Sequence, residues 1–397
     1  MDTPHDDEPV EKIKEALQNS NQALAMEKIS EYLDRQNNIP LNIAITGETG
    51  SGKSTFVNRV RGIKEWDTGA APTGVRECTK VPTPYPHPKY PNVKLWDLPG
   101  VGTTNFPADQ YLKFVEFEKF DFFIIISDTR FRENDVKLAQ GIQKMKKKFY
   151  FVRSKIDNDL RAQKLTQREF SETETKEQIK EDCIQCLQEQ GIQSPQVFLV
   201  SSFELHLHDF SLLHATLERE LPEHKRNTLL FAMPNISQEI INKKKKAFQT
   251  NIKWYAVASA AAAGVPIPGL SIAVDAPLLV GVVTQYVFGF GLDIPSLKRL
   301  AESSGVPFDD LKGVIISPLA ATKITAELIL KVLIQCASTA ALLAAEEGVR
   351  FIPIIGIPAA MALSFKITSS ALNFILNKLA DDAQRVFEKV LDCNTTE

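Results

Sequence analysis

The chain has little cysteine and no strong excess of either charge. Among its 397 residues are five cysteines, which are odd in number and scattered along the chain. They indicate reduced thiols in a cytosolic setting rather than a disulfide framework. The net charge is −3, which argues against broad binding to a nucleic-acid backbone. We therefore expect a cytoplasmic protein with no nucleic-acid partner.

The two ends of the chain lack the usual targeting and lipidation signals. The N-terminus is acidic and polar, unlike a secretory signal. Asp2 stands where N-myristoylation requires glycine, and Cys393 lies one place too early for prenylation. Any membrane contact is therefore expected to come from within the chain.

Apolar residues make up 44% of the chain, which excludes wholesale disorder. Five short runs rich in β-branched and aromatic residues are typical of buried strands: Leu41–Thr46, Val93–Trp96, Phe122–Ile126, Phe149–Val152 and Val197–Val200. Amphipathic stretches with helical spacing lie between them: Ser54–Val60, Tyr111–Phe120, Asp135–Met145 and Lys176–Glu189. This alternation predicts an α/β domain over residues 39–218, a phosphate-loop, Ras-like domain with three layers and a mostly parallel sheet.

The rest of the chain favours helices. A helical pattern covers residues 9–35, and strand signals disappear after Pro222. We expect an all-helical domain made of residues 219–397, on which the N-terminal segment 1–38 packs, because a lone amphipathic helix is marginal in water. The tract Trp254–Leu292 carries a single charge, Asp275. It is either a pair of buried core helices or a hairpin that inserts into a membrane surface, where the basic run Lys243–Lys246 would suit anionic lipids.

One segment matches the phosphate-loop pattern at every fixed position, with a strand before it and a helix after it. It consists of Gly47, Glu48, Thr49, Gly50, Ser51, Gly52, Lys53 and Ser54, followed by Thr55. Glycines allow successive N–H groups to turn toward an anion, and the following helix adds its positive end. Lys53 is expected to reach the β- and γ-phosphates, and the Ser54 hydroxyl to bind Mg²⁺.

Two later motifs favour GTP over ATP. Ser154, Lys155 and Asp157 follow a predicted strand, where a carboxylate can accept hydrogen bonds from N1 and N2 of guanine. Ser201 and Ser202 follow the last predicted strand and fit a loop that offers an N–H to guanine O6. We expect GTP and GDP as ligands.

The γ-phosphate side of the site is predicted from Asp97 and Gly100. Asp97 would hold Mg²⁺ through water, and the N–H of Gly100 would contact the γ-phosphate. Thr73 and Thr79 both qualify as the threonine that covers Mg²⁺. The residue after Gly100 is Val101, which cannot orient water as a glutamine does there in Ras-like enzymes. Another residue must therefore orient the attacking water, or the protein is a GTP-dependent scaffold that scarcely turns GTP over.

These motifs together resemble the interferon-inducible, or immunity-related, GTPases. The resemblance rests on the phosphate loop with its lysine, residues 73–79, 96–107 and 121–127, and the run 149–153. Lys53 places the chain with the members that keep this lysine. The resemblance implies a cytosolic GTPase that dimerises across its nucleotide face and forms higher oligomers. It also implies peripheral association with intracellular membranes, including endomembranes or pathogen vacuoles, in innate immune defence. By the same likeness, Glu77 is the glutamate needed for activation in the dimer.

Overall fold

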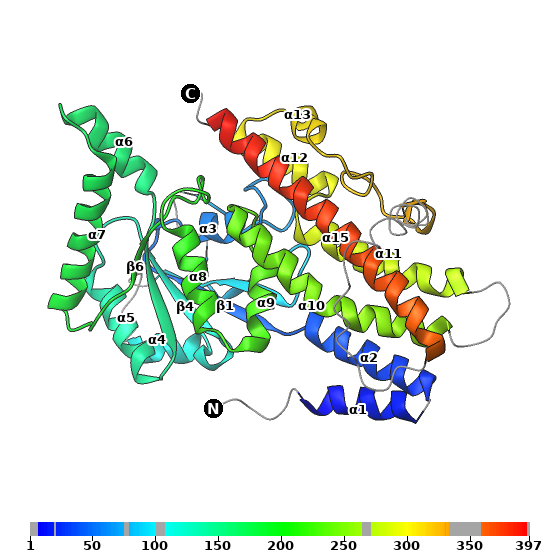
Figure 1. The fold of residues 1–397 in the computed structure, drawn as a ribbon. Coiled ribbons are helices and arrows are strands. Elements are labelled where there is room, and N and C mark those ends of the chain that lie inside the picture. The colour runs from blue at the N-terminus through cyan, green and yellow to red at the C-terminus, as the bar shows by residue number, and fades with distance from the viewer. Residues whose placement is uncertain are drawn as a thin grey trace. The chain divides into compact units, whose positions relative to one another are not determined.

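The computed structural model describes residues 7–19, 21–74, 79–100, 108–263, 271–329, 331–332 and 359–394. The chain divides into two compact units (Figure 1). Ile39–Ser237 form the first, which we call the sheet unit. Met1–Asn38 and Gln238–Glu397 form the second, which we call the helical unit.

The sheet unit contains a six-stranded sheet with the order β2-β3-β1-β4-β5-β6. Its strands are β1 (Leu41–Thr46), β2 (Thr83–Pro86), β3 (Val93–Asp97), β4 (Phe122–Ser127), β5 (Lys148–Arg153) and β6 (Val197–Leu199). β1 pairs in parallel with β3 and β4, β5 pairs in parallel with β4 and β6, and β2 runs antiparallel to β3. Every residue of β4 is buried, as expected for a central strand covered on both faces. The predicted mostly parallel α/β fold is confirmed.

Helices cover both faces of this sheet (Figure 1). They are α3 (Lys53–Val60), α4 (Ala108–Phe114), η1 (Phe117–Lys119), α5 (Glu133–Lys144), α6 (Ile156–Thr166), α7 (Glu172–Glu189), α8 (Phe210–Glu220) and α9 (Glu223–Ala232). One core lies under α4 to α7, where Leu112, Leu138 and Leu187 join Phe123 and Phe151 in one buried cluster. α3 and α9 contact β1 and β3, and α8 contacts β6. The two layers of helices keep water from both faces of the sheet.

The sequence analysis did not predict α6, α8 and α9 of the sheet unit, and it also differs from the structure in one strand and in the end of the unit. β2 was not predicted, because its residues Thr-Pro-Tyr-Pro lack a strand pattern and the strand is defined by its pairing with β3. Prolines are tolerated at a sheet edge, where a missing N–H donor leaves no ladder bond unmade. The unit also ends at Ser237, later than the predicted residue 218, because α9 contacts β1 and β3.

The helical unit joins the N-terminal helices to the C-terminal half of the chain. It contains α1 (Asp7–Gln18), α2 (Gln22–Asn37), α10 (Gln238–Ala263), α11 (Ser271–Gly289), α12 (Ile294–Ser304), α13 (Phe308–Gly313) and α15 (Ala359–Asn394). Asn21 separates α1 from α2, since its side chain caps α2 by accepting from the Leu24 N–H at 3.2 Å. α10 packs along α15 and α2. Tyr32 of α2 meets Trp254 of α10 with ring centroids 5.3 Å apart.

The apolar tract that raised the membrane question is partly described. By length and composition, one apolar helical stretch of the described residues, Pro277–Ser304, could cross a membrane, and half of its most apolar window is buried. The basic run 243–246 is not a uniformly solvated face. Lys244 is 1% exposed and donates to the carbonyl of Gly289 at 2.9 Å, so it ends α11 rather than facing lipid. Residues 264–270 lie outside the described part of the chain.

Candidate nucleotide site

The phosphate loop connects β1 to α3 and requires glycine at particular positions. Gly47 has φ +136°, and a Cβ there would lie 2.0 Å from the backbone oxygen of Ile126 in β4. Gly50 and Gly52 also have positive φ, at +86° and +95°. These conformations strain residues that carry a Cβ. The loop therefore lies directly against β4 and turns into the N-terminus of α3, an arrangement suited to anions.

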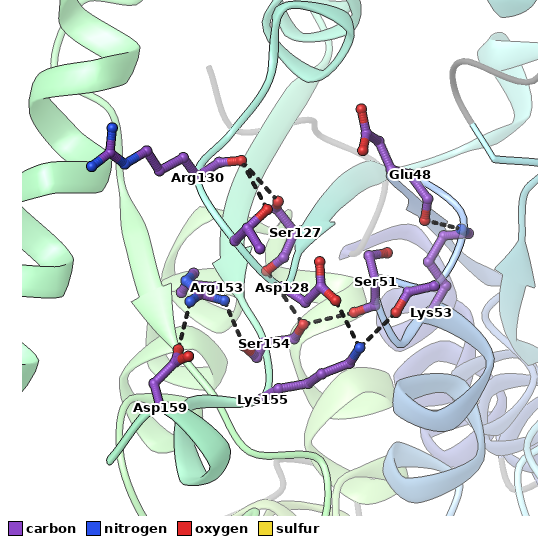
Figure 2. Close-up of polar contacts among 12 residues, drawn as sticks. Glu48, Ser51, Lys53, Ser127, Asp128, Arg130, Arg153, Ser154, Lys155 and Asp159 are labelled. Carbon is purple, nitrogen blue, oxygen red and sulfur yellow. Dashed lines mark hydrogen bonds and ion pairs between the residues drawn. The ribbon is translucent and has the colours of Figure 1, made fainter. Parts of the chain in front are cut away.

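Lys53 is the first residue of α3 and is 7% exposed. Its Nζ donates to the carbonyl of Glu48 at 2.8 Å (Figure 2). It also donates to the carbonyl of Gly47 at 3.1 Å. The ammonium group is thus held over the loop by main-chain acceptors. An incoming phosphate is a stronger, charged acceptor for the same group.

Three oxygen-bearing side chains meet beside the loop. Asp97, at the end of β3, accepts from the Ser54 hydroxyl at 2.6 Å and from the Thr79 hydroxyl at 2.9 Å, both at Oδ2. The side chain is fully buried, and its Oδ1 has no hydrogen-bond partner. Burial raises the pKa of Asp97, and the two hydroxyl donors partly offset this.

This cluster fits a hard cation. Hydroxyl and carboxylate oxygens are ligands that Mg²⁺ accepts, and it usually completes its shell with water and phosphate oxygens. Groups of three or more His, Cys, Asp or Glu suited to a metal do not occur among the described residues. Ser54, Thr79 and Asp97 are therefore the residues that would hold Mg²⁺ together with the nucleotide.

Gly100 follows the same strand and lies against the phosphate loop. A Cβ there would come within 2.5 Å of Thr49 Oγ1 and 3.1 Å of the Thr49 backbone nitrogen. Only a glycine allows this approach, so the main chain after β3 and the loop after β1 meet where a γ-phosphate would lie.

The predicted base-reading residues lie on the other side of the loop. The Ser154 hydroxyl donates to the carbonyl of Ser51 at 2.6 Å (Figure 2). Lys155 has φ +58°, and its Nζ donates to the carbonyl of Gly50 and to Asp128 Oδ2, each at 2.7 Å. The serine thus supports the loop, and the lysine stem is held alongside it. Asp157 stands in the first turn of α6 and is half-buried.

The last predicted motif follows β6. Ser201 is 1% exposed, and its hydroxyl has no hydrogen-bond partner. The buried hydroxyl of Ser51 in the phosphate loop has none either. Ser202 is half-buried beside it. Buried polar atoms without partners are costly, so their presence at this end of the sheet favours a ligand that completes them.

Several predicted site residues make no contribution that the structure describes. Thr73 is exposed, whereas Thr79 reaches Asp97, which favours Thr79 of the two candidates. Thr55 is half-buried on α3. Glu77 and Val101 lie outside the described residues.

The sequence analysis missed three charged residues after β4. Asp128 pairs with Lys155, and Arg132 Nη1 lies 2.6 Å from Glu48 Oε2. Asp135 caps α5 by accepting from the Arg132 N–H at 3.1 Å, and burial raises its pKa to about 6. Their signal was their position after the carboxyl end of a strand, where ligands of parallel sheets bind. This position points to the phosphate loop only once β4 is known to lie beside β1.

A phosphate loop at the carboxyl end of a parallel sheet, with an Asp-x-x-Gly segment and a Ser-Lys-x-Asp segment beside it, defines a phosphate-loop nucleotide-binding protein. The comparisons with known proteins are more specific. The family description "Interferon-inducible GTPase (IIGP)" matches residues 6–390. The chain belongs to this family, is a GTPase and binds GTP and GDP.

Curated relatives are similar in sequence to this protein over most of the chain. Interferon-inducible GTPase 5 of Rattus norvegicus is 39% identical, over 98% of this chain and 84% of that protein. Interferon-gamma-inducible GTPase 10 of Mus musculus is 41% identical, over 78% of this chain and 75% of that protein. Among solved structures, a variant of Aquifex aeolicus Era bound to GDP·AlF4⁻ is 20% identical with a TM-score of 0.30, over 46% of this chain and 56% of that chain.

Proposed function

We propose that this GTPase hydrolyses GTP with Mg²⁺, is activated by nucleotide-dependent self-assembly, and acts at intracellular membranes in cell-autonomous innate defence. The observation that carries the catalytic part is the meeting of Ser54, Thr79 and Asp97 beside the phosphate loop. Ser54 belongs to the loop, Asp97 to β3 and Thr79 to the segment between α3 and β2. Binding of one metal–nucleotide complex would thus contact residues from three separate segments of the chain.

The phosphates are bound by this chain's own donors. The loop supplies backbone N–H groups, and Lys53 exchanges its two carbonyl acceptors for phosphate oxygens. Ser54, Asp97 and Thr79 would hold Mg²⁺ here, and the ion would supply positive charge to offset the negative charge of the phosphates. Thr79, released from Asp97, is the hydroxyl available to close over the metal.

Guanine is read by Asp157, with the Lys155 stem along the base and the loop of Ser201 and Ser202 at O6. The ion pair between Lys155 and Asp128 supports this assignment, because it holds the lysine stem in place before the base arrives.

Self-assembly is proposed because the chain itself offers no glutamine after Gly100. Val101 cannot orient water, so the orienting group must come from elsewhere. Glu77 is our candidate, acting in a dimer formed across the nucleotide face. The named relatives are interferon-inducible GTPases, which supports a role in innate defence. The feature behind the proposed peripheral contact of a cytoplasmic protein with endomembranes or pathogen vacuoles is the apolar stretch Pro277–Ser304, whose most apolar window is half buried.

The decisive experiment measures GTP turnover per molecule against protein concentration. The turnover per molecule of the wild type should rise with protein concentration, whereas that of Glu77→Ala should not change. Glu116→Ala is the matched control, because Glu116 is an exposed carboxylate paired only locally, with Lys119; its activity should follow wild type. Flat wild-type turnover that is nevertheless appreciable would contradict activation by self-assembly.

The scaffold alternative is tested in the same assay. If turnover is negligible at every concentration while GTP binds, the hydrolytic proposal fails and the protein is a GTP-dependent scaffold. Lys53→Ala should then still weaken GTP binding by about a hundredfold, since charged hydrogen bonds to phosphate are lost. Asp157→Asn should shift preference from guanine to xanthine nucleotides, and unchanged selectivity would contradict the assignment of Asp157.

A further inference from the structure

One side of α3 faces the turn that is predicted to read guanine. A Cβ at Gly52, the N-cap of this helix, would lie 3.8 Å from Ser154 Oγ and 3.9 Å from Lys155 Cε. Residues at positions i, i+4 and i+7 lie on the same side of a helix. Phe56 and Arg59 therefore share this side with Gly52, and Arg59 lies about 10 Å further along the helix axis.

Arg59 contacts an exposed aromatic ring that follows the last predicted motif. Its guanidinium carbon lies 4.9 Å from the ring centroid of Phe203, within the range of a cation–π contact. Phe203 comes directly after Ser201 and Ser202 in the chain and is 62% exposed. The guanidinium thus covers one face of the ring, and most of its remaining surface is open to water.

An ion pair holds the guanidinium against this ring. Arg59 Nη2 lies 2.8 Å from Glu65 Oε2, and both side chains are largely buried. Buried pairs are screened by salt and water much less than surface pairs. The arginine is therefore fixed before any ligand arrives, which lowers the entropy cost of binding a flat ligand on the open face of Phe203.

The two turns that are proposed to read guanine, residues 154–157 and 201–202, touch each other. The Ile156 N–H donates to the Val200 carbonyl at 3.5 Å. Asp157 and Ser201 come directly after these two residues, and Phe203 follows in the second turn. When the two turns bind the edge of a flat base, the two faces of the base remain for side chains.

We propose that Phe203 stacks on the guanine base of the bound nucleotide, and that Arg59 and Glu65 position its ring. This inference rests on the function proposed above, in which the Lys155 stem covers one face of the base and the other face is unassigned. Stacking on an aromatic side chain tolerates any base, because every base has a π-face. Phe203 thus adds affinity, whereas Asp157 selects guanine.

The test measures the affinity of the full chain for GDP and for xanthosine diphosphate (XDP) by calorimetry, with Mg²⁺ present. Phe203→Ala should weaken GDP binding about tenfold, because an aromatic stacking contact is lost. In the Asp157→Asn background, which should prefer XDP, the same change should weaken XDP binding by the same factor. Leu207→Ala is the matched control, since it removes another exposed apolar side chain from the same loop. It should change neither affinity.

Arg59→Lys tests the positioning residue. Lysine keeps a charge for Glu65 but lacks the planar group that lies against the ring. The change should weaken GDP binding about threefold in the wild-type background. It should have no effect in the Phe203→Ala background, because no ring is left to position. An equal loss in both backgrounds would refute the positioning role.

Three further outcomes overturn the stacking proposal. Phe203→Ala could bind GDP as tightly as wild type, or Leu207→Ala could lose as much affinity as Phe203→Ala. Phe203→Ala could also weaken GDP without weakening XDP in the Asp157→Asn background, which would indicate contact with the edge of the base. Failure of the proposed function gives a different result: Asp157→Asn would still prefer GDP, whatever the effect of Phe203→Ala, and the stacking proposal would fail with it.

Discussion

Two buried aspartates, one in each unit, differ in how their oxygens are used. Asp382 in α15 accepts from the N–H groups of Ile316 at 2.8 Å and Ser317 at 3.0 Å, and also pairs with Arg385. Asp97 accepts from two hydroxyls at Oδ2, and its Oδ1 has no partner. Both side chains are 0% exposed. The two carboxylates are equally buried but have different roles. One that accepts from main-chain N–H groups stabilises the fold, whereas one with an unpartnered oxygen beside two hydroxyls is suited to bind a ligand.

The same contrast holds for buried hydroxyls. In the helical unit, Ser259 and Thr368 bond to each other at 2.9 Å. In the sheet unit, the hydroxyls of Ser51 and Ser201 have no partner. Tyr286 is a counterexample, since its buried hydroxyl in α11 also lacks one. An unpartnered atom therefore indicates a site when several occur together, as they do around the phosphate loop.

Asp382→Ala gives the largest expected effect. Loss of the carboxylate leaves the N–H groups of Ile316 and Ser317 without their acceptor and removes the ion pair with Arg385. The free energy of unfolding should therefore fall by about 3–5 kcal/mol. GTP affinity of the folded protein should not change. Chemical denaturation and nucleotide titration measure the two quantities. Asp381→Ala, the half-buried neighbour, should cost no more than about 0.5 kcal/mol. A loss of stability no larger than that control would refute the structural role of Asp382.

Asp135→Asn tests how much stability the protein loses by burying a carboxylate near the phosphate loop. Burial raises its pKa from 3.8 to about 6 in the folded chain, so the folded state holds a proton that the unfolded chain has already lost. Protonated Asp135 contributes fully to the free energy of unfolding below pH 3.8. This contribution decreases as the pH rises from 3.8 to about 6, and it is lost at higher pH. The loss is up to about 3 kcal/mol.

The asparagine removes this penalty and keeps an oxygen for the Arg132 N–H. Nucleotide-free Asp135→Asn should therefore gain stability over wild type at pH 7.5 but not at pH 4, by thermal unfolding at both pH values. An unchanged difference between the two proteins across this range would mean that Asp135 titrates normally.

Asp97→Asn should act on the metal rather than on the fold. With Mg²⁺ present, GTP affinity should fall by about tenfold to a hundredfold, because the amide is a weaker partner for a hard cation. In EDTA the same variant should bind nearly as well as wild type. Asp67→Asn is the control, since Asp67 accepts from the Lys64 N–H within its own loop. An equal loss with and without Mg²⁺ would place Asp97 outside the metal site.

Single hydroxyl deletions give the smallest effects, and their signs should be opposite. Ser259→Ala strands the Thr368 hydroxyl and should lower the free energy of unfolding by about 1 kcal/mol. Ser201→Ala removes a buried hydroxyl that has no partner and should raise it by a similar amount in nucleotide-free protein. Thermal unfolding of the two variants measures both. Destabilisation by both changes would break the contrast between the units.

Local patterns predicted much of the sheet unit. β4 was predicted because Phe122–Ile126 is an unbroken apolar run, and the phosphate loop because its spacing is contained in eight residues. β2 was missed because its pairing with β3 defines it. α6 was missed because only Ile156 and Leu160 of its 11 residues are buried, which leaves too little apolar pattern to indicate a helix. Asp128 was missed for another reason: its contact with Lys155 depends on β4 and β5 being neighbours, which strand order decides and local sequence does not.

The proline-rich edge of the sheet has a consequence for crowding. Pro84 and Pro86 remove two main-chain donors from β2, and at the opposite edge the Leu199 N–H is already taken by Asp209. Neither border offers a full row of main-chain groups to a passing strand. Pairing of strands edge to edge between copies of this protein is therefore disfavoured, even at high local concentration.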